Sequence, residues 1–229
     1  MEKLGIIGGL GPASTVDYYN GIVAGCLSAA GVYPEIVIDS LNMTEVISTL
    51  ERGEPDVLTD LLVRSAERLT AAGADFAVVA SNTPHIVFDA VAARAPLPLL
   101  SIVGETCAYA QRMGYRRVLV AGTRFTMGSG LYTEAFGHYC IEAVTPGTED
   151  QETLYGLFYP NLENGIVVPE DKVRMLTLLR RLLAEQPYDA LVLGCTELPL
   201  MIREGDLDIA LLDTARVHID AAVRRMTGV

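Results

Sequence analysis

The sequence predicts an α/β fold of two similar parallel-sheet domains. Short apolar runs of strand length alternate with longer runs of helical periodicity along the 229 residues, a pattern typical of parallel sheets covered by helices on both faces. One sequence segment also occurs twice. Asp75–Ser81 resembles Asp189–Cys195, which lies 114 positions further along the chain (195 − 81). Since this separation is half the chain, we expect a duplicated domain and a site where the two halves meet.

Each expected strand is a short apolar run, often β-branched, bounded by Gly, Asp or Pro. The strands are expected at Lys3–Ile7, Glu35–Asp39, Phe76–Ala80, Leu99–Ile102, Arg117–Ala121, Ile141–Val144, Ala190–Leu193 and Ile209–Leu211. Helices are expected where apolar residues recur every three to four positions between start and stop residues such as Pro55 and Gly73. They are expected at Ser14–Ala30, Pro55–Ala72, Ile86–Ala93, Val103–Met113, Met127–Phe136, Gln151–Asn164, Pro169–Glu185 and Thr214–Met226.

The repeat also predicts the domain boundaries. Two strands that run into a Gly turn, ending near Gly8 and Ala121, precede Ser81 and Cys195 by 73 (81 − 8) and 74 (195 − 121) residues. We expect a first domain of residues 1–100 plus 208–229 and a second domain of residues 101–207. In open parallel sheets, ligands bind beyond the carboxyl ends of the strands. The turns are therefore expected to converge on one inter-domain cleft.

The composition excludes several classes of function. The net charge of −12 at pH 7 opposes binding to nucleic acid or to anionic membranes. No apolar stretch approaches the ~18 residues that cross a bilayer, and the amino terminus has no signal-peptide layout, so a cytoplasmic protein is expected. The four cysteines lack zinc-ligand spacing, and His138 and His218 have no partner ligands nearby, so no metal is expected.

Cys195 is the main candidate for a catalytic group. It follows a buried strand and Gly194, and it precedes a helix start expected at Thr196-Glu197. The free N–H groups and the dipole at such a helix start stabilise a thiolate, which can act as a nucleophile or a base. The alternative interpretation is a buried structural thiol, because free Cys packs as a small hydrophobe.

Ser81 holds the mirrored position in the first half of the chain. The residues that follow, Asn82 and Thr83, carry an amide and a hydroxyl suited to binding a carboxylate. For Ser81 alone, a helix N-cap is the alternative interpretation. His85 lies four residues further on, and it either tunes Ser81 through a hydrogen bond or caps and packs.

A Gly-rich turn at Gly8–Thr15 opens the first helix and half-matches a dinucleotide-binding fingerprint. Ser14 occupies the third glycine position, and Asp39 lies 30 residues beyond Gly9 (39 − 9) rather than the usual ~20. We therefore interpret the turn as a close backbone approach to a small carboxylate, with Gly9 and Leu10 contributing to binding.

Four motifs together resemble the aspartate/glutamate racemase family. In chain order, and spanning nearly the whole sequence, they are Gly8–Pro12, Ser81–His85, Gly122–Thr126 and Gly194–Glu197. The resemblance implies two α/β domains related by pseudo-twofold symmetry and a cofactor-independent amino-acid racemase. It also implies a homodimer, a small amino-acid substrate, and one acid/base residue on each face of the substrate Cα.

On this chain, the resemblance assigns the L-enantiomer to Cys195 and the opposite face to Ser81, where typical members carry a second Cys. Without pyridoxal phosphate, hydrogen-bond donors around the substrate carboxylate must stabilise the carbanion. The expected donors are Asn82, Thr83, Thr123 and Thr196, with His85 and Glu197 behind the catalytic groups.

The substrate side chain is less constrained by the sequence. Family members that favour aspartate hold its distal carboxylate with basic residues; Arg52 is the first candidate here, followed by Lys172 and Arg124, each with an ordinary surface charge as the alternative. Two other functions stay open. A single-cysteine decarboxylase similar to arylmalonate decarboxylase needs only Cys195, and an amino-acid-binding protein could keep the cleft while lacking turnover because of Ser81.

Overall fold

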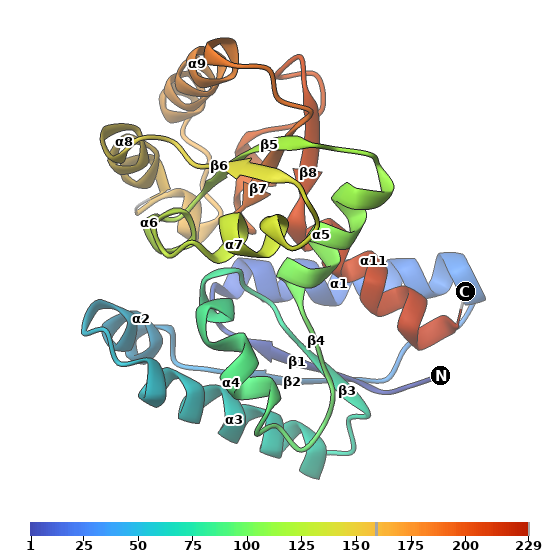
Figure 1. The fold of residues 1–229 in the computed structure, drawn as a ribbon. Coiled ribbons are helices and arrows are strands. Elements are labelled where there is room, and N and C mark those ends of the chain that lie inside the picture. The colour runs from blue at the N-terminus through green and yellow to red at the C-terminus, as the bar shows by residue number, and fades with distance from the viewer. Residues whose placement is uncertain (159, 229) are drawn as a thin grey trace. The chain divides into compact units, whose positions relative to one another are not determined.

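The computed structural model describes residues 1–158 and 160–228, without the side chain of residue 163. The chain forms two compact units: unit 1 is Met1–Glu105 with Ala215–Val229, and unit 2 is Thr106–Thr214 (Figure 1). Each unit contains one four-stranded parallel sheet. The predicted α/β fold of two parallel-sheet domains is confirmed.

The two sheets have the same strand order. Sheet 1 runs β2-β1-β3-β4 and sheet 2 runs β6-β5-β7-β8, so strands β1 to β4 correspond to β5 to β8. The strands of unit 1 are β1 (Leu4–Gly8), β2 (Ile36–Ser40), β3 (Phe76–Val79) and β4 (Leu99–Leu100), and those of unit 2 are β5 (Arg117–Gly122), β6 (Glu142–Val144), β7 (Ala190–Gly194) and β8 (Ala210–Asp213). Ser81 and Cys195 therefore follow corresponding strands, β3 and β7.

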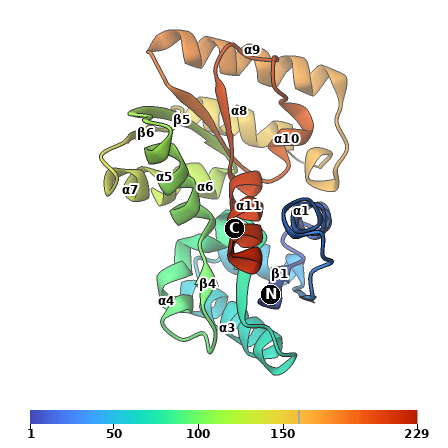
Figure 2. The ribbon, with the colours of Figure 1, turned by 90° about the vertical axis from the view of Figure 1, so that its right-hand side faces the viewer.

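Helices cover both faces of sheet 1. The helices are α1 (Pro12–Ala30), α2 (Met43–Glu51), α3 (Pro55–Ala71), α4 (Phe88–Ala92) and α11 (Thr214–Thr227), with a 3₁₀ turn η1 (Thr83–Val87). Apolar residues of α2, α3 and α4 pack with Ile7 and Val79 on one face. Those of α1 and α11 pack with Ile6 and Val78 on the other. Figure 2 shows α1 and α11 side by side, and an added Cβ at Gly25 would lie 2.7 Å from Val223.

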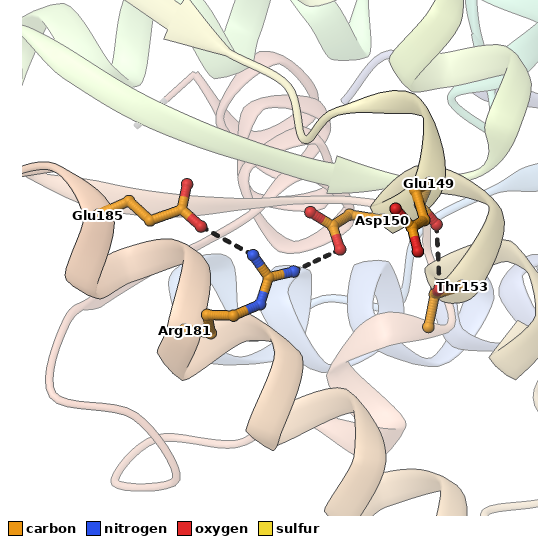
Figure 3. Close-up of polar contacts among 5 residues, drawn as sticks. All are labelled: Glu149, Asp150, Thr153, Arg181 and Glu185. Atoms are coloured by element: carbon orange, nitrogen blue, oxygen red, sulfur yellow. Dashed lines mark hydrogen bonds and ion pairs between the residues drawn. The ribbon is translucent and has the colours of Figure 1, made fainter.

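Unit 2 has the same layered build. Its helices are α5 (Ile102–Arg112), whose residues up to Glu105 belong to unit 1, α6 (Arg124–Gly128), α7 (Leu131–Gly137), α8 (Thr148–Phe158), α9 (Pro169–Glu185) and α10 (Leu198–Met201), with a 3₁₀ turn η2 (Leu162–Asn164). Residues of α6, α8, α9 and α10 form one apolar cluster with Leu119 and Leu193. Arg181 of α9 also pairs with Asp150 of α8 and, at 2.8 Å, with Glu185 of its own helix (Figure 3).

The last strand differs from the sequence expectation. Residues 208–229 were expected to return together to the first domain, but β8 pairs with β7 in sheet 2. The segment between them, residues 195–209, has the length of a crossover that joins neighbouring parallel strands. Only α11 returns to unit 1.

Several helical segments also differ from expectation. Helix α2 was not expected, because its β-branched residues weaken the helical signal, but Asn42 caps it by accepting a hydrogen bond from the N–H of Thr44 at 3.1 Å. The helix expected at Met127–Phe136 is divided into α6 and α7 by Gly130, which has a φ of 77°. The one expected at Gln151–Asn164 is α8 followed by η2, and residue 159 in it lies outside the described residues.

The expectation of no membrane span can be compared with the helices that the structure describes. None of them combines the length and the apolar character that crossing a bilayer requires.

Candidate functional site

In unit 1, the backbone on both sides of Ser81 is held by side chains. The Ser14 hydroxyl donates to the carbonyl oxygen of Ala80 at 2.9 Å, and Nδ1 of His85 contacts the carbonyl oxygen of Ser81 at 2.9 Å. Ser81 is 8% exposed, and its hydroxyl has no hydrogen-bond partner among the described residues. The turn therefore fixes the position of this hydroxyl and leaves it able to act on a ligand.

His85 is a neutral positioning group. The N–H of Ile102 donates to Nε2 of His85 at 3.2 Å, so the ring proton sits on Nδ1 and is donated to the Ser81 carbonyl. Burial lowers the pKa of His85 to about 4. The hydrogen bond of His85 is to the backbone carbonyl of Ser81 and not to its hydroxyl.

Asn82 and Thr83 lie in the same turn as Ser81. Asn82 is buried, and its carbonyl oxygen accepts the backbone N–H of His85 at 3.0 Å. Thr83 begins the 3₁₀ turn η1. Both residues therefore lie in the turn that directly follows Ser81.

In unit 2, Cys195 forms a hydrogen bond with a buried carboxylate. The Cys195 thiol donates to Oε2 of Glu197 at 3.0 Å, and the Thr196 hydroxyl donates to the same oxygen at 2.9 Å. Cys195 and Glu197 are each 7% exposed. The thiol proton therefore points at a group that can accept it.

The helix after Cys195 differs from the expected one. It was expected to begin at Thr196-Glu197 and to stabilise a thiolate, but α10 begins at Leu198 and has four residues. Pro199 lies in its first turn, a position that proline favours because its missing N–H is not needed there. A helix this short has a small dipole, and the thiol donates its hydrogen bond to the carboxylate of Glu197.

Strands β5 and β7 end side by side. Gly122 pairs with Gly194, and an added Cβ at Gly122 would lie 2.8 Å from the Gly194 carbonyl oxygen. Thr123 and Cys195 therefore leave adjacent strands at the same edge of the sheet. Thr123 also caps α6, because its hydroxyl accepts the N–H of Thr126 at 3.2 Å.

The Gly-rich turn uses its polar groups internally. The N–H of Gly9 donates to the Thr15 hydroxyl at 2.8 Å, which in turn donates to the Gly11 carbonyl at 3.1 Å. Gly9 has a φ of +81°, and an added Cβ would lie 2.4 Å from the Leu41 carbonyl oxygen. Glycine is thus required here by the turn itself, and its N–H is already engaged. Leu10 packs in the apolar core.

Asp39, the acidic residue that a nucleotide-binding turn would need, has other partners. Asp39 accepts hydrogen bonds from Arg68 at 2.6 and 2.9 Å and from the Ser65 hydroxyl at 2.5 Å. Burial opposes the charge of Asp39, but these donors outweigh it and lower the pKa of its carboxyl. Both carboxylate oxygens are therefore engaged within unit 1.

The three basic candidates for the distal carboxylate have different surroundings. Arg52 pairs with Glu54 at 2.7 Å and its side chain is 55% exposed, and Lys172 pairs with Asp206 at 2.7 Å. Arg124 instead lies over the ring of Tyr155, 4.9 Å from its centroid. The structure thus neutralises the first-ranked candidate and leaves Arg124 without a carboxylate partner among the described residues.

The other cysteines offer no comparable site. Cys26 and Cys107 are buried and Cys140 is exposed. Burial raises the pKa of Cys107 to about 12. Within residues 1–158 and 160–228, no group of three or more His, Cys, Asp and Glu side chains is arranged to hold a metal ion.

Sequence reasoning missed the roles of Ser14 and Thr15. Both are buried hydroxyls in the first turn of α1, and their signal in the sequence was the pairing of two hydroxyl residues with a preceding Gly-rich turn. Their hydroxyls stabilise that turn and connect its helix to the strand end before Ser81 by hydrogen bonds.

Comparison with known proteins identifies the family. Residues 7–222 match the family of Asp/Glu/Hydantoin racemases. The chain belongs to this family. The resemblance found in the four sequence motifs is thereby confirmed, and the family match spans both units.

Individual racemases of the family resemble the chain over nearly its full length. The broad specificity amino-acid racemase RacX of Bacillus subtilis is 22% identical over 221 residues, covering 93% of this chain and 92% of that protein. A putative Asp/Glu racemase from Yersinia pestis is 30% identical, with a TM-score of 0.90 and 99% coverage of both chains. An aspartate racemase homologue from Pyrococcus horikoshii is 31% identical, with a TM-score of 0.82 and full coverage of both.

Proposed function

We propose that this family member is a cofactor-independent amino-acid racemase in which Cys195 acts on the L-enantiomer and Ser81 on the opposite face of Cα. The observation that carries the proposal is the contact between the Cys195 thiol and the buried carboxylate of Glu197 at 3.0 Å. A carboxylate at this distance can accept the thiol proton and produce the thiolate that a racemase needs as its base.

The proposed reaction begins with transfer of the Cys195 proton to Glu197. The thiolate then takes the α-proton: the Cα–H bond breaks, an S–H bond forms, and the electron pair stays on Cα and the substrate carboxylate. The Ser81 hydroxyl returns a proton to the opposite face, and a solvent water replaces the proton that Ser81 gives. The hydroxide left by that water takes the proton held by Glu197, which restores the starting protonation state. Asn82 and Thr83 are the proposed donors that stabilise the carbanion through its carboxylate, because the Thr196 hydroxyl already donates to Glu197.

A hydroxyl is a much weaker acid than a thiol, so the two faces should exchange protons at different rates. We expect the carbanion formed from an L-amino acid to take a proton back from Cys195 more often than from Ser81. In D2O, the proton that Cys195 takes exchanges with solvent deuterium through Glu197 before it returns, so deuterium should enter the starting L-amino acid faster than the D-amino acid appears. Mass spectrometry combined with chiral chromatography measures both rates.

Three variants test the assignment of the two faces. Cys195→Ala should lower exchange from the L-enantiomer by about 100- to 10,000-fold, the usual contribution of an acid/base group. Ser81→Ala should lower formation of the D-enantiomer while exchange into the L-enantiomer continues, and Ser81→Cys should speed racemisation. Cys140→Ser, at an exposed thiol, is the control and should change nothing. Equal exchange into both enantiomers that persists in Cys195→Ala would contradict the proposal.

One observation favours a second candidate function. Because position 81 holds a serine, Cys195 is the one thiol that directly follows a strand among the described residues. A decarboxylase that protonates a carbanion after CO2 loss needs only one thiol. Release of CO2 from substituted malonates, with no deuterium entering any amino acid, would identify that activity.

A further inference from the structure

Two fully buried polar residues of unit 1, Tyr18 and His218, have no part in the proposed reaction. A polar side chain in a core costs free energy unless its hydrogen bonds are satisfied there. The contacts of these two residues lead to the ring of His85, and from that ring to the backbone of Ser81. They therefore lie behind one of the two proposed acid/base groups.

Hydrogen bonds fix the peptide planes on both sides of the Ser81 Cα. The plane before it is held at the Ala80 carbonyl, which accepts the Ser14 hydroxyl at 2.9 Å. The plane after it is held at the Ser81 carbonyl, which accepts the Nδ1–H of His85 at 2.9 Å. Because peptide units are planar, two fixed planes set both backbone dihedrals of Ser81 and the direction of its Cβ. The place of the His85 ring therefore controls where the Ser81 hydroxyl can reach.

Three neighbours hold the His85 ring. The N–H of Ile102 donates to its Nε2 at 3.2 Å. The ring of Phe88 stacks on it with a centroid distance of 5.1 Å, and the ring of His218 meets it edge-on at 6.3 Å. Phe88 lies only three residues further along the same segment, whereas His218 comes from α11. His218 is thus a neighbour that can fix the His85 ring relative to the helices on the sheet.

The orientation of His218 is fixed in turn by two hydrogen bonds. Its Nε2 lies 3.1 Å from the Leu100 carbonyl oxygen, which can only accept, so the ring proton sits on Nε2. Its Nδ1 therefore accepts the Tyr18 hydroxyl at 2.9 Å. Both nitrogens of His218 and both of His85 are engaged, so neither ring has a proton to give to a substrate. Any contribution that they make to the reaction is one of position.

We propose that His218 is a positioning residue for the reaction: with Tyr18 it holds the ring of His85, and through that ring it sets the direction of the Ser81 hydroxyl. This inference rests on the proposed racemase function. A hydroxyl is a weak acid, and a misplacement of about 1 Å can cost a proposed transfer about 100-fold in rate. Cys195 belongs to unit 2 and donates its hydrogen bond to Glu197. The effect should therefore fall on one face of Cα alone.

The test measures the two faces separately. Each chiral protein amino acid is supplied as its L-enantiomer in D2O, and the one from which the wild type forms the D-enantiomer fastest is used. Formation of the D-enantiomer reports the step at Ser81, and deuterium entry into the remaining L-enantiomer reports the step at Cys195. Tyr18→Phe and His218→Gln should each lower the first rate by about 10- to 100-fold and leave the second unchanged. A merely structural role would not separate the two rates.

Tyr132→Phe is the matched control. Tyr132 lies 114 positions after Tyr18 (132 − 18), the separation between Ser81 and Cys195, and it is 1% exposed within unit 2. The variant loses an equally buried phenol without touching His218. It should therefore not lower formation of the D-enantiomer relative to deuterium entry into the L-enantiomer.

Two variants of His85 separate its position from its ring chemistry. An asparagine side chain can place an N–H near the site of Nδ1, so His85→Asn should retain more formation of the D-enantiomer than His85→Leu, which has no donor for the Ser81 carbonyl. Melting temperatures show whether each variant is folded. If His218→Gln does not fold, Tyr18→Phe decides the question, because it removes a single oxygen atom.

The possible failures can be told apart. An equal fall of both rates in Tyr18→Phe and His218→Gln, or the same one-sided fall in Tyr132→Phe, would reduce the effect to a general loss of packing and overturn the inference. Unchanged formation of the D-enantiomer in both variants would overturn it too. In each of these cases the proposed function stands. A wild type that forms no D-enantiomer and takes up no deuterium with any of these amino acids would overturn the proposed function and the inference with it.

Discussion

The pairing of Cys195 with Glu197 determines how its thiol can ionise. A thiol beside a carboxylate and a thiolate beside a carboxylic acid have the same net charge, so moving the proton between them adds no charge to the buried site. Ionising a lone buried thiol does add one, at a large desolvation cost. Cys107 shows this second case, because burial alone raises its pKa to about 12.

Replacing Glu197 should change the pH dependence of thiol reactivity. With the carboxylate present, the thiolate fraction depends on how Cys195 and Glu197 share one proton. The rate at which iodoacetamide alkylates Cys195 should therefore vary little between about pH 6 and pH 8. In Glu197→Gln the proton must leave to solvent, and the rate should rise with pH as for an ordinary thiol. Mass spectrometry of the modified peptide measures both profiles.

This experiment is best done in a Cys140→Ser background, because Cys140 is the exposed thiol and Cys26 and Cys107 are buried. Glu142→Gln provides the matched control, since Glu142 is a largely exposed glutamate of unit 2. Identical profiles for the Glu197→Gln and Glu142→Gln variants would mean that Glu197 does not share the proton.

Four elements of unit 1 are joined by two buried histidines. His218 of α11 contacts the Tyr18 hydroxyl of α1 at 2.9 Å through Nδ1, and the Leu100 carbonyl of β4 at 3.1 Å through Nε2. His85 of η1 packs edge-on to His218, with ring centroids 6.3 Å apart. Both rings are neutral, because burial lowers their pKa values to about 4 for His85 and about 3 for His218.

These histidines should make unit 1 sensitive to mild acid. Below pH ~6.5 the unfolded chain binds a proton on each imidazole, whereas the folded chain does not until pH falls to about 4 and about 3. As the pH is lowered through this range, each of the two histidines should therefore reduce the free energy of unfolding by about 1.4 kcal/mol per pH unit. Urea unfolding at about pH 7, 6 and 5 measures how steeply the free energy of unfolding changes with pH.

The slope can be assigned to individual histidines. His218→Gln should reduce it, and His138→Gln, at the exposed third histidine, should leave it unchanged. The chosen range lies above the ordinary titration of carboxylates, so ion pairs such as Lys172–Asp206 contribute little. A slope that is the same in wild type and His218→Gln would contradict the prediction.

The sequence predicted those elements whose signal is local. The eight strands of the described residues were predicted, because each is a short apolar run. The placement of Ser81 and Cys195 after corresponding strands was predicted because the run before each is duplicated. The assignment of β8 to sheet 2 was not predicted, since strand pairing depends on contacts between residues far apart in the sequence. The hydrogen bonds of Thr15 and Ser14 were missed for a similar reason, as first-turn hydroxyls resemble ordinary helix caps.

At the scale of the whole molecule, the chain passes between the units twice, within α5 and at the start of α11. Unit 2 is one continuous segment, and all residues of its main apolar cluster come from that segment. Unit 1 is discontinuous. One face of its sheet is covered by residues near both ends of the chain, with α11 supplying Ala215, Ile219, Ala222, Val223 and Met226.

This asymmetry predicts that the two units respond differently to being separated. A fragment of residues 101–214, which keeps α5 whole, should fold alone and melt cooperatively by circular dichroism. Residues 1–105 alone should not, because the loss of five buried α11 side chains removes about 5–10 kcal/mol, as much as the stability of a typical domain. Joining residues 1–105 to 215–229 through a flexible Gly/Ser linker should restore a cooperative transition. If residues 1–105 melt cooperatively without α11, then burial against α11 is not what stabilises the first sheet.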